Sequence, residues 1–167
     1  AIIGCKLLNE DLSHQISVVD FDTISNLFGE NLFFYKLFPK SRRLSKYHLN
    51  DSELEEPIEV DAVKGAFLFV PKAVLDNLNN LDEQFYFYYE ETDLCYRWKK
   101  SGGKVIYFPK ASIIHLGGAS TDANHWFKYS NQHIAKIQFF QKHFNGTKFI
   151  LAVIIHELGL ILRFPLY

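Results

Sequence analysis

Two kinds of apolar spacing alternate along this chain, and that alternation restricts its fold more than any other feature. Runs rich in β-branched and aromatic residues, typical of strands, occur at 1–8, 60–70, 105–108 and 112–115. Segments with the apolar spacing, caps or end charges typical of helices occur at 23–38, 90–101, 124–144 and 148–163. Because the two kinds of segment intermix, the sequence predicts an α/β fold.

Prolines and glycines refine this outline. Pro71 is expected to open a short helix, because proline is tolerated in the first helical turn. Pro109 is expected to separate two short strands, and the polar residues 39–57 predict a surface loop. Gly65 interrupts the run at 60–70, where a backbone without a side chain can approach a ligand closely.

Composition narrows the class of protein. Lys and Arg number 18 against 19 Asp and Glu, so the basic excess of a duplex-binding protein is missing and we expect no nucleic-acid partner. Two cysteines cannot build a disulfide framework, which favours a reducing, cytoplasmic compartment. The chain begins at Ala1 and contains no Met, and we expect it to be a fragment of a longer protein.

An acidic cluster at the expected start of the helix over 90–101 is the sharpest chemical feature. Glu90, Glu91 and Asp93 repel one another, and repulsion raises the proton affinity of at least one of them. A carboxylate tuned in this way and facing a cleft suits a general base. The alternative is structural: a helix with acids in its first turn and an i,i+4 pair between Asp93 and Arg97.

His115 is a second candidate. It ends a predicted strand and is followed by Leu116 and two glycines, which leaves open backbone beside the imidazole. A neutral histidine held in this way can bind a metal ion. The alternative is a histidine at a sheet edge that is simply satisfied by hydrogen bonds.

Several segments in one order resemble the second half of family 2 glycosyltransferases, particularly bacterial rhamnosyltransferase-like members. YEETDLCYR at 89–97 is similar to the family's Glu-Asp-x-Asp-Leu-Cys-x-Arg signature. The other similar segments are KLLNED at 6–11, VDAVKGAFL at 60–68, LDEQFY at 81–86, GKVIYFP at 103–109 and IHLGGAS at 114–120. Two positions depart from the family pattern: Glu91 stands where Asp is usual, and Asn79-Asn80 where Gly-Gly is usual.

The resemblance implies a partial fold of the GT-A type, a mixed sheet flanked by helices whose nucleotide-binding half is missing. Residues 1–120 would be the acceptor-side part of a catalytic domain, and residues 121–167 a helical tail. The implied activity is inverting transfer of a sugar from a nucleotide-sugar donor to a glycan or lipid-linked acceptor, as in cell-surface polysaccharide synthesis. A fragment that lacks the donor half is expected to be inactive alone.

The resemblance also implies roles for single residues. Glu91 falls at the family's catalytic base, beside Glu90 and Asp93, and His115 falls where related enzymes complete a site for Mg²⁺ or Mn²⁺. The implied substrate-side residues are Gly65, Ala66 and Arg97; Gly65 leaves room for the acceptor, and Arg97 with Asp93 holds the base's helix in place.

The tail and the aromatic run leave alternatives open. The helix over 124–144 is cationic and aromatic, and the apolar stretch 149–162 is shorter than the roughly 20 residues that span a bilayer. Such a pair can lie peripherally on the inner face of a membrane, pack on the catalytic domain, or join a homo-oligomer. A non-catalytic alternative for the whole chain is a module that binds glycan or protein through the aromatic run 85–89.

Overall fold

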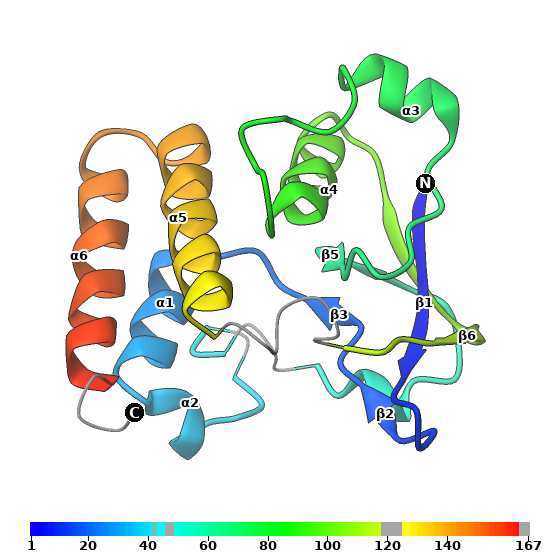
Figure 1. Ribbon diagram of the computed structural model, residues 1–167, viewed down its shortest axis with the longest axis horizontal. Helices are drawn as coiled ribbons and strands as arrows, with labels where there is room; N and C mark the ends of the chain where they lie inside the picture. Colours follow the sequence, from blue (N-terminus) through cyan, green and yellow to red (C-terminus); the bar gives the residue numbers. More distant parts are fainter. Residues whose placement is uncertain (42, 46–48, 118–124, 164–167) are drawn as a thin grey trace. The chain divides into compact units, whose positions relative to one another are not determined.

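The computed structural model describes residues 1–41, 43–45, 49–117 and 125–163, and confirms the predicted α/β class. The chain forms two compact units (Figure 1). Unit 1 comprises residues 1–20 and 50–136, and unit 2 comprises residues 21–49 and 137–167. The predicted boundary after residue 120 lies outside the described residues and stays a prediction.

Unit 1 is built on a four-stranded mixed sheet in the order β2-β1-β6-β4. The strands are β1 (Ile2–Leu8), β2 (His14–Gln15), β4 (Ile58–Val60) and β6 (Val105–Ile114), and β1 runs parallel to β6 and antiparallel to β2. A second sheet pairs β3 (Val18–Val19) with β5 (Ala62–Val63). Side chains from both sheets form the core, among them Ile2, Leu7, Val63, Val105 and Tyr107.

The two short strands predicted at 105–108 and 112–115 are a single strand, β6. Its pairing with β1 skips from Phe108 opposite Cys5 to Ser112 opposite Lys6. Pro109 lies inside the skipped stretch and has no N–H for the ladder, so the strand bulges there instead of ending. The run at 60–70 is likewise not one strand: it contains the last residue of β4, then β5, and a bridge between Ile3 and Phe69.

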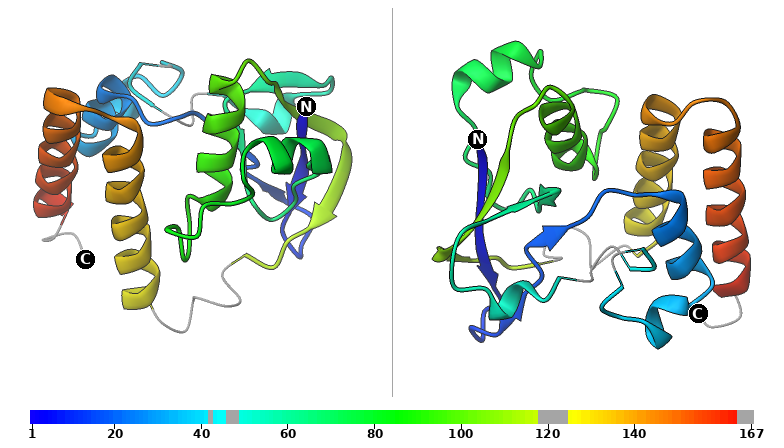
Figure 2. Two further views of the ribbon diagram at one scale, coloured as in Figure 1. Left: turned by 90° about the horizontal axis from the view of Figure 1, so that it is seen from above. Right: turned by 180° about the vertical axis from the view of Figure 1, so that it is seen from behind.

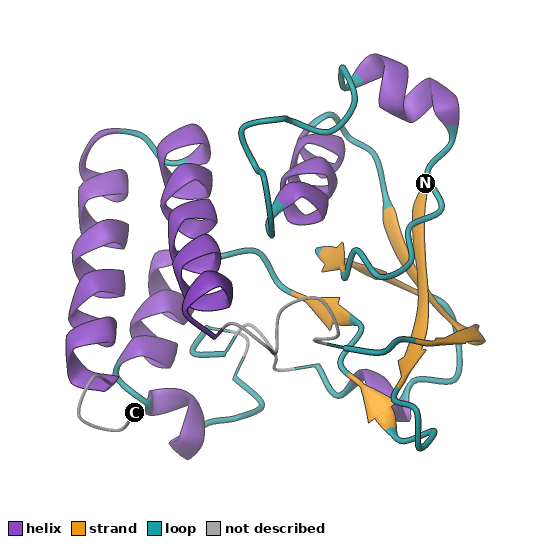
Figure 3. Cartoon of the chain, viewed as in Figure 1, coloured by secondary structure: helices purple, strands orange, loops and turns teal. Residues whose placement is uncertain are grey.

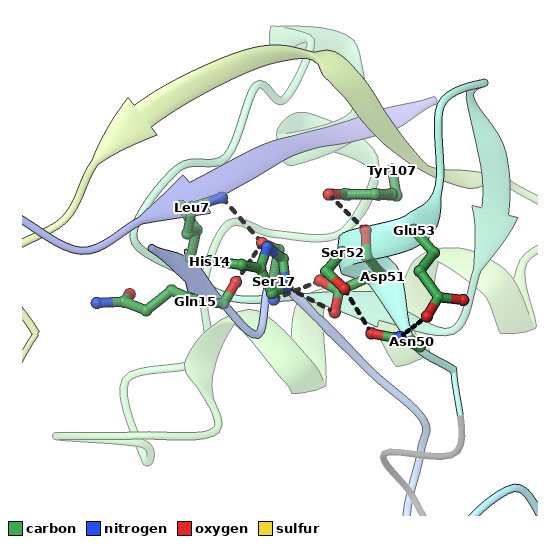
Figure 4. Close-up of polar contacts among 9 residues, drawn as sticks. All are labelled: Leu7, His14, Gln15, Ser17, Asn50, Asp51, Ser52, Glu53 and Tyr107. Atoms are coloured by element: carbon green, nitrogen blue, oxygen red, sulfur yellow. Dashed lines mark hydrogen bonds and ion pairs between the residues drawn. The ribbon is translucent and has the colours of Figure 1, made fainter. Parts of the chain in front are cut away.

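A buried polar cluster ties the end of β1 to the short 3-10 helix η1 (Asp51–Glu53), as Figure 4 shows. Asp51 is 2% exposed; its Oδ2 accepts the Ser17 N–H at 2.7 Å and its Oδ1 lies 3.0 Å from His14 Nε2. The hydroxyl of Tyr107 donates to the Asp51 carbonyl at 3.3 Å. The polar segment expected to be a surface loop therefore contains a buried carboxylate, because these donors replace its water.

Unit 2 is helical, with α1 (Ile24–Asn31), α2 (Phe34–Leu37), the second part of α5 (His125–His143) and α6 (Gly146–Arg163), drawn as helices in Figure 3. Thr23 caps α1, in a capping box with Asn26. The single helix expected over 23–38 is wrong: Phe33 is left-handed at φ 62° and separates α1 from α2. The break lets Phe34 stack on Phe28 with ring centroids 5.7 Å apart, a contact that residues six apart on one helix cannot make.

The two long helices match their predicted positions closely. Views from above and from behind show α5 and α6 as neighbouring helices joined by a short turn (Figure 2). Phe139, Phe140 and Phe144 from α5 and its end are buried with Ala152 of α6. Among the described helices, none is long and apolar enough to cross a membrane.

Candidate functional site

The acidic cluster lies where the sequence places it, in the first turn of α4 (Glu90–Lys100). Its residues do not share one environment: Glu90 and Glu91 are half-buried, while Asp93 is 0% exposed. The first turn of a helix favours negative charge, and the basic Lys99 and Lys100 stand in the last turn. The carboxylate of Asp93 is therefore separated from solvent, while those of Glu90 and Glu91 are partly exposed.

Glu91 lies against Gly65, the residue expected to leave room for a ligand. A Cβ placed on Gly65 would stand 3.4 Å from Cβ and Cγ of Glu91 and 3.6 Å from its Cδ. Gly65 and the neighbouring Ala66 are both exposed. The structure thus brings Glu91 and Gly65 together, with the exposed Ala66 next to Gly65 in the chain.

Glu90 has one buried carboxylate oxygen. This atom, Oε2, has no hydrogen-bond partner among the described residues. A buried acceptor of this kind is a polar group that a donor from water or a ligand would satisfy.

Asp93 and Arg97 form the i,i+4 pair that the structural alternative for the cluster predicts. Arg97 Nε donates to Asp93 Oδ2 at 2.7 Å, and the carboxylate is fully buried. The other guanidinium nitrogens donate to two backbone carbonyls, at 2.5 Å to Leu78 and at 2.9 Å to Asn80. Arg97 therefore fixes the loop after α3 (Lys72–Asn77) against the helix that carries Glu91.

Asn79 and Asn80 form the turn in the same loop. Both residues are left-handed, at φ 55° and 66°. The Asn80 N–H donates to the Leu75 carbonyl at 2.8 Å and the Asn79 N–H to the Asp76 carbonyl at 3.3 Å, which is the Schellman arrangement at a helix end. Glycine prefers this conformation and asparagine tolerates it, so the turn keeps its geometry without glycine.

Tyr88 and Tyr89 are a feature that sequence reasoning missed. Both are left-handed, at φ 71° and 70°, directly before the first residue of α4. Aromatic residues rarely adopt this conformation, and such strain gathers at sites where a chain must present a group in one orientation. No residue type signalled it, because tyrosine has no preference for positive φ.

The aromatic run 85–89 is not one continuous surface. Phe85 is 4% exposed, whereas Tyr86 is 82% exposed. Phe87 and Tyr88 contact each other edge to face with centroids 4.6 Å apart, and Phe87 also lies 5.7 Å from the ring of Phe127. Within this run Tyr86 presents most of its ring to solvent.

His115 lies just beyond β6 and is hydrogen-bonded to Leu8 at the end of β1 and to Gln15 of β2. Its N–H donates to the Leu8 carbonyl at 2.8 Å, and its Nδ1 lies 2.8 Å from Gln15 Oε1. The Gln15 amide nitrogen donates to the His115 carbonyl at 2.9 Å and to Asn9 Oδ1 at 2.6 Å. Gln15 therefore holds His115 at both its ring and its backbone.

Asp11, at the far end of this hydrogen-bond network, determines which groups in it donate and which accept. Asp11 accepts the Ser13 hydroxyl at 2.5 Å, so that hydroxyl in turn accepts from the Asn9 amide nitrogen at 2.8 Å. Hydrogen bonds from the Ser13 hydroxyl and then from its N–H lower the pKa of Asp11, which keeps this carboxylate ionised and able only to accept.

The same argument applies to the imidazole of His115. Both hydrogens of the Gln15 amide nitrogen are donated to oxygen atoms, and Gln15 Oε1 can only accept. Nδ1 of His115 must therefore donate to it. In the neutral ring the lone pair then lies on Nε2, which is the state that a metal ligand requires. A hydrogen bond that fixes the ring in this way is also the usual support of a metal-binding histidine.

Other possible ligands are not gathered around it. No group of three or more His, Cys, Asp or Glu side chains that could hold a metal ion occurs among residues 1–41, 43–45, 49–117 and 125–163. Gly118, Ala119 and Ser120 of the segment IHLGGAS lie outside the described residues. His115 is thus a single candidate ligand with suitable donor chemistry.

Comparison with known proteins adds no relative: no protein-family model, no curated protein and no solved structure matches this chain.

Proposed function

We propose that this chain is the acceptor-side part of an inverting glycosyltransferase with a GT-A type fold, and that Glu91 is its general base. The observation that carries the proposal is the placement of Glu91 against Gly65, with a half-buried carboxylate beside backbone that has no side chain. The support is the order of six segments similar to family 2 together with the rigid setting of α4.

In the proposed reaction the acceptor hydroxyl binds at the Glu91 carboxylate, next to the exposed backbone of Gly65 and Ala66. Glu91 takes the hydroxyl proton onto a carboxylate oxygen while the acceptor oxygen attacks the anomeric carbon of the donor sugar. The bond from that carbon to the nucleoside diphosphate breaks on the opposite face, and its electron pair leaves with the diphosphate. Arg97 and Asp93 act as positioning residues, because they fix the first turn of α4 without touching the reacting atoms.

A divalent cation, Mg²⁺ or Mn²⁺, fits the donor chemistry of His115 Nε2. When bound, it would supply positive charge that stabilises the departing diphosphate. Its other ligands would come from the donor and from the nucleotide-binding half that we propose to precede this chain.

The test uses the full coding sequence, including the region that precedes Ala1. We expect that region to supply a further βαβ half-domain with an Asp-x-Asp at a strand end, and the full product to release nucleoside diphosphate from a nucleotide sugar with a glycan acceptor. Glu91→Gln should lower turnover by about 100-fold or more without changing the melting temperature. Glu83→Gln, at an exposed glutamate outside the cluster, is the matched control and should keep full turnover. Retained turnover in Glu91→Gln would remove Glu91 from the mechanism.

A second candidate function is a glycan-binding module, and the exposed ring of Tyr86 favours it. An aromatic face of this kind can stack on a sugar ring. A module should bind glycan without nucleotide or metal, lose binding in Tyr86→Ala, and tolerate Glu91→Gln. Calorimetry with the 167-residue chain separates the two candidates, because the transferase proposal requires Glu91 and the module does not.

A further inference from the structure

Helix α6 exposes a stripe of apolar residues. Six of its exposed large aliphatic side chains share this stripe and are between 45% and 66% exposed: Ile150, Leu151, Ile154, Leu158, Ile161 and Leu162. Leu160, which is 39% exposed, lies outside it. At 100° per residue these six positions cover about a third of the helix circumference. Thr147 is the remaining residue of the stripe, which therefore carries no charge.

The buried side of the same helix holds one large aliphatic residue, Ile155, together with small and polar residues. Ala152, Gly159 and His156 face the interior of unit 2, where the ring of Phe140 lies edge to face with His156 at 6.1 Å between centroids. A helix on the surface of a water-soluble domain normally buries most of its large aliphatic residues, whereas α6 leaves these six exposed. A continuous exposed apolar patch of this kind marks a surface that meets an apolar partner.

The charge of unit 2 indicates what that partner is. Its residues include eight Lys and Arg against three Asp and Glu, a net charge of +5, whereas the rest of the chain has ten against sixteen. Lys142 and Lys148 are both exposed and flank the start of α6, and Glu157 is the acidic residue on that helix. An apolar stripe in a cationic unit is complementary to an anionic lipid surface, which offers acyl chains below and negative head groups above.

We infer that the stripe on α6 docks unit 2 onto an anionic membrane surface, with the helix lying in the interface. A second copy of this chain is the less suitable occupant, because pairing two α6 stripes would bring together two units of charge +5. The inference is independent of the transferase proposal, since it concerns a different surface and its test involves no catalysis.

The test is co-sedimentation of the 167-residue chain with vesicles. Binding to phosphatidylcholine vesicles that contain phosphatidylglycerol should be at least about tenfold stronger than to phosphatidylcholine alone, and should weaken in high salt. The double variant Ile154→Gln, Leu158→Gln should weaken binding by about tenfold or more, because two aliphatic side chains no longer enter the interface. Both residues are exposed, so the fold should persist, which circular dichroism checks.

Ile134→Gln is the matched control, since Ile134 on α5 is 52% exposed and Ile154 is 49% exposed. The control should keep wild-type binding to the vesicles. Failure to bind anionic vesicles, or unchanged binding of the double variant, overturns the inference. Concentration-dependent dimerisation in sedimentation velocity that the double variant abolishes, without vesicle binding, would assign the stripe to a second copy instead.

Discussion

Nδ1 of His115 lies 2.8 Å from Oε1 of Gln15, a residue one hundred positions earlier in the chain. A chain of hydrogen bonds connects this pair to the Asp11 carboxylate. Because that carboxylate can only accept, it fixes which group donates in every hydrogen bond from Asp11 to His115. The orientation of the His115 ring and the location of its lone pair are therefore set by Gln15 of β2 and the loop that precedes β2, not by the neighbours of His115 in sequence.

This network predicts the tautomer of His115. In nitrogen–proton correlation spectra of neutral imidazoles, His115 should be protonated at Nδ1, and His14, whose Nε2 lies 3.0 Å from Asp51, should be protonated at Nε2. Gln15→Leu should remove the preference at His115, whereas Gln15→Glu, which still accepts, should retain it. An Nε2 proton on His115 in the wild-type chain would contradict the assigned network.

The buried pair of Asp93 and Arg97 predicts a large loss of stability when one partner is removed. Arg97→Met should lower the free energy of unfolding by about 3 kcal/mol, because it leaves a buried carboxylate without its partner and frees the Leu78–Asn80 turn. The matched control is Lys110→Met: Lys110 lies 2.7 Å from Glu56, but both side chains are more than half exposed. That control should change stability by less than about 1 kcal/mol in urea titrations, and equal losses would show that burial is not the cause.

Gly159 predicts an effect opposite to helix propensity. Replacing a helical glycine with alanine normally stabilises a helix by about 1 kcal/mol. At Gly159 a Cβ would overlap the side chain of Asn31, which is buried and donates to the Leu27 carbonyl at 2.8 Å. Gly159→Ala should therefore lower stability by about 1–3 kcal/mol in thermal or urea unfolding. A stabilised variant would mean that α1 and α6 do not approach as described.

The buried thiol of Cys95 and the buried phenol of Tyr107 predict that the protein loses stability at alkaline pH. Burial, and then the charge of Glu91, raises the pKa of Cys95 to about 12, and burial followed by the charge of Asp51 raises the pKa of Tyr107 to about 12. The unfolded chain releases these protons near pH 9 and pH 10, before the folded chain does, so the folded state binds more protons in this range and stability falls as pH rises. The urea midpoint should decline progressively above about pH 9.

Two variants isolate the groups in that prediction. Cys95→Ala should be less stable than the wild-type chain at pH 7, because it leaves a small cavity, yet its midpoint should decline less steeply above pH 9. Tyr107→Phe should remove the part of the decline in the urea midpoint that begins near pH 10. Both thiols should resist alkylation at pH 8 in the folded chain, since the pKa of Cys5 is also raised by burial.

Local signals were enough for the elements whose stability is local. The sequence predicted β1, the helix over 90–101 with its acids first and bases last, and the two long C-terminal helices, and the structure places all of them within a few residues. Thr23 as a cap and Pro71 before a short helix were also predictable, because capping depends on the cap residue and its next three neighbours.

Elements that depend on distant partners were not predictable in this way. The break at Phe33 lets Phe34 reach Phe28, and the bulge at Pro109 lets β6 continue beside β1 where the sequence suggested two strands. Asp51, in a stretch as polar as any loop, is buried because Ser17 and His14 supply its hydrogen bonds.

For the candidate site, the sequence determined which groups are present and that Glu90, Glu91 and Asp93 begin one helix. Only the tertiary structure decided that Asp93 is buried with Arg97, that Glu91 lies against Gly65, and that Gln15 orients His115. The physical reason is the range of the forces involved. Helix periodicity and capping act over three or four residues, while burial and hydrogen bonds between separate segments exist only after the chain has folded.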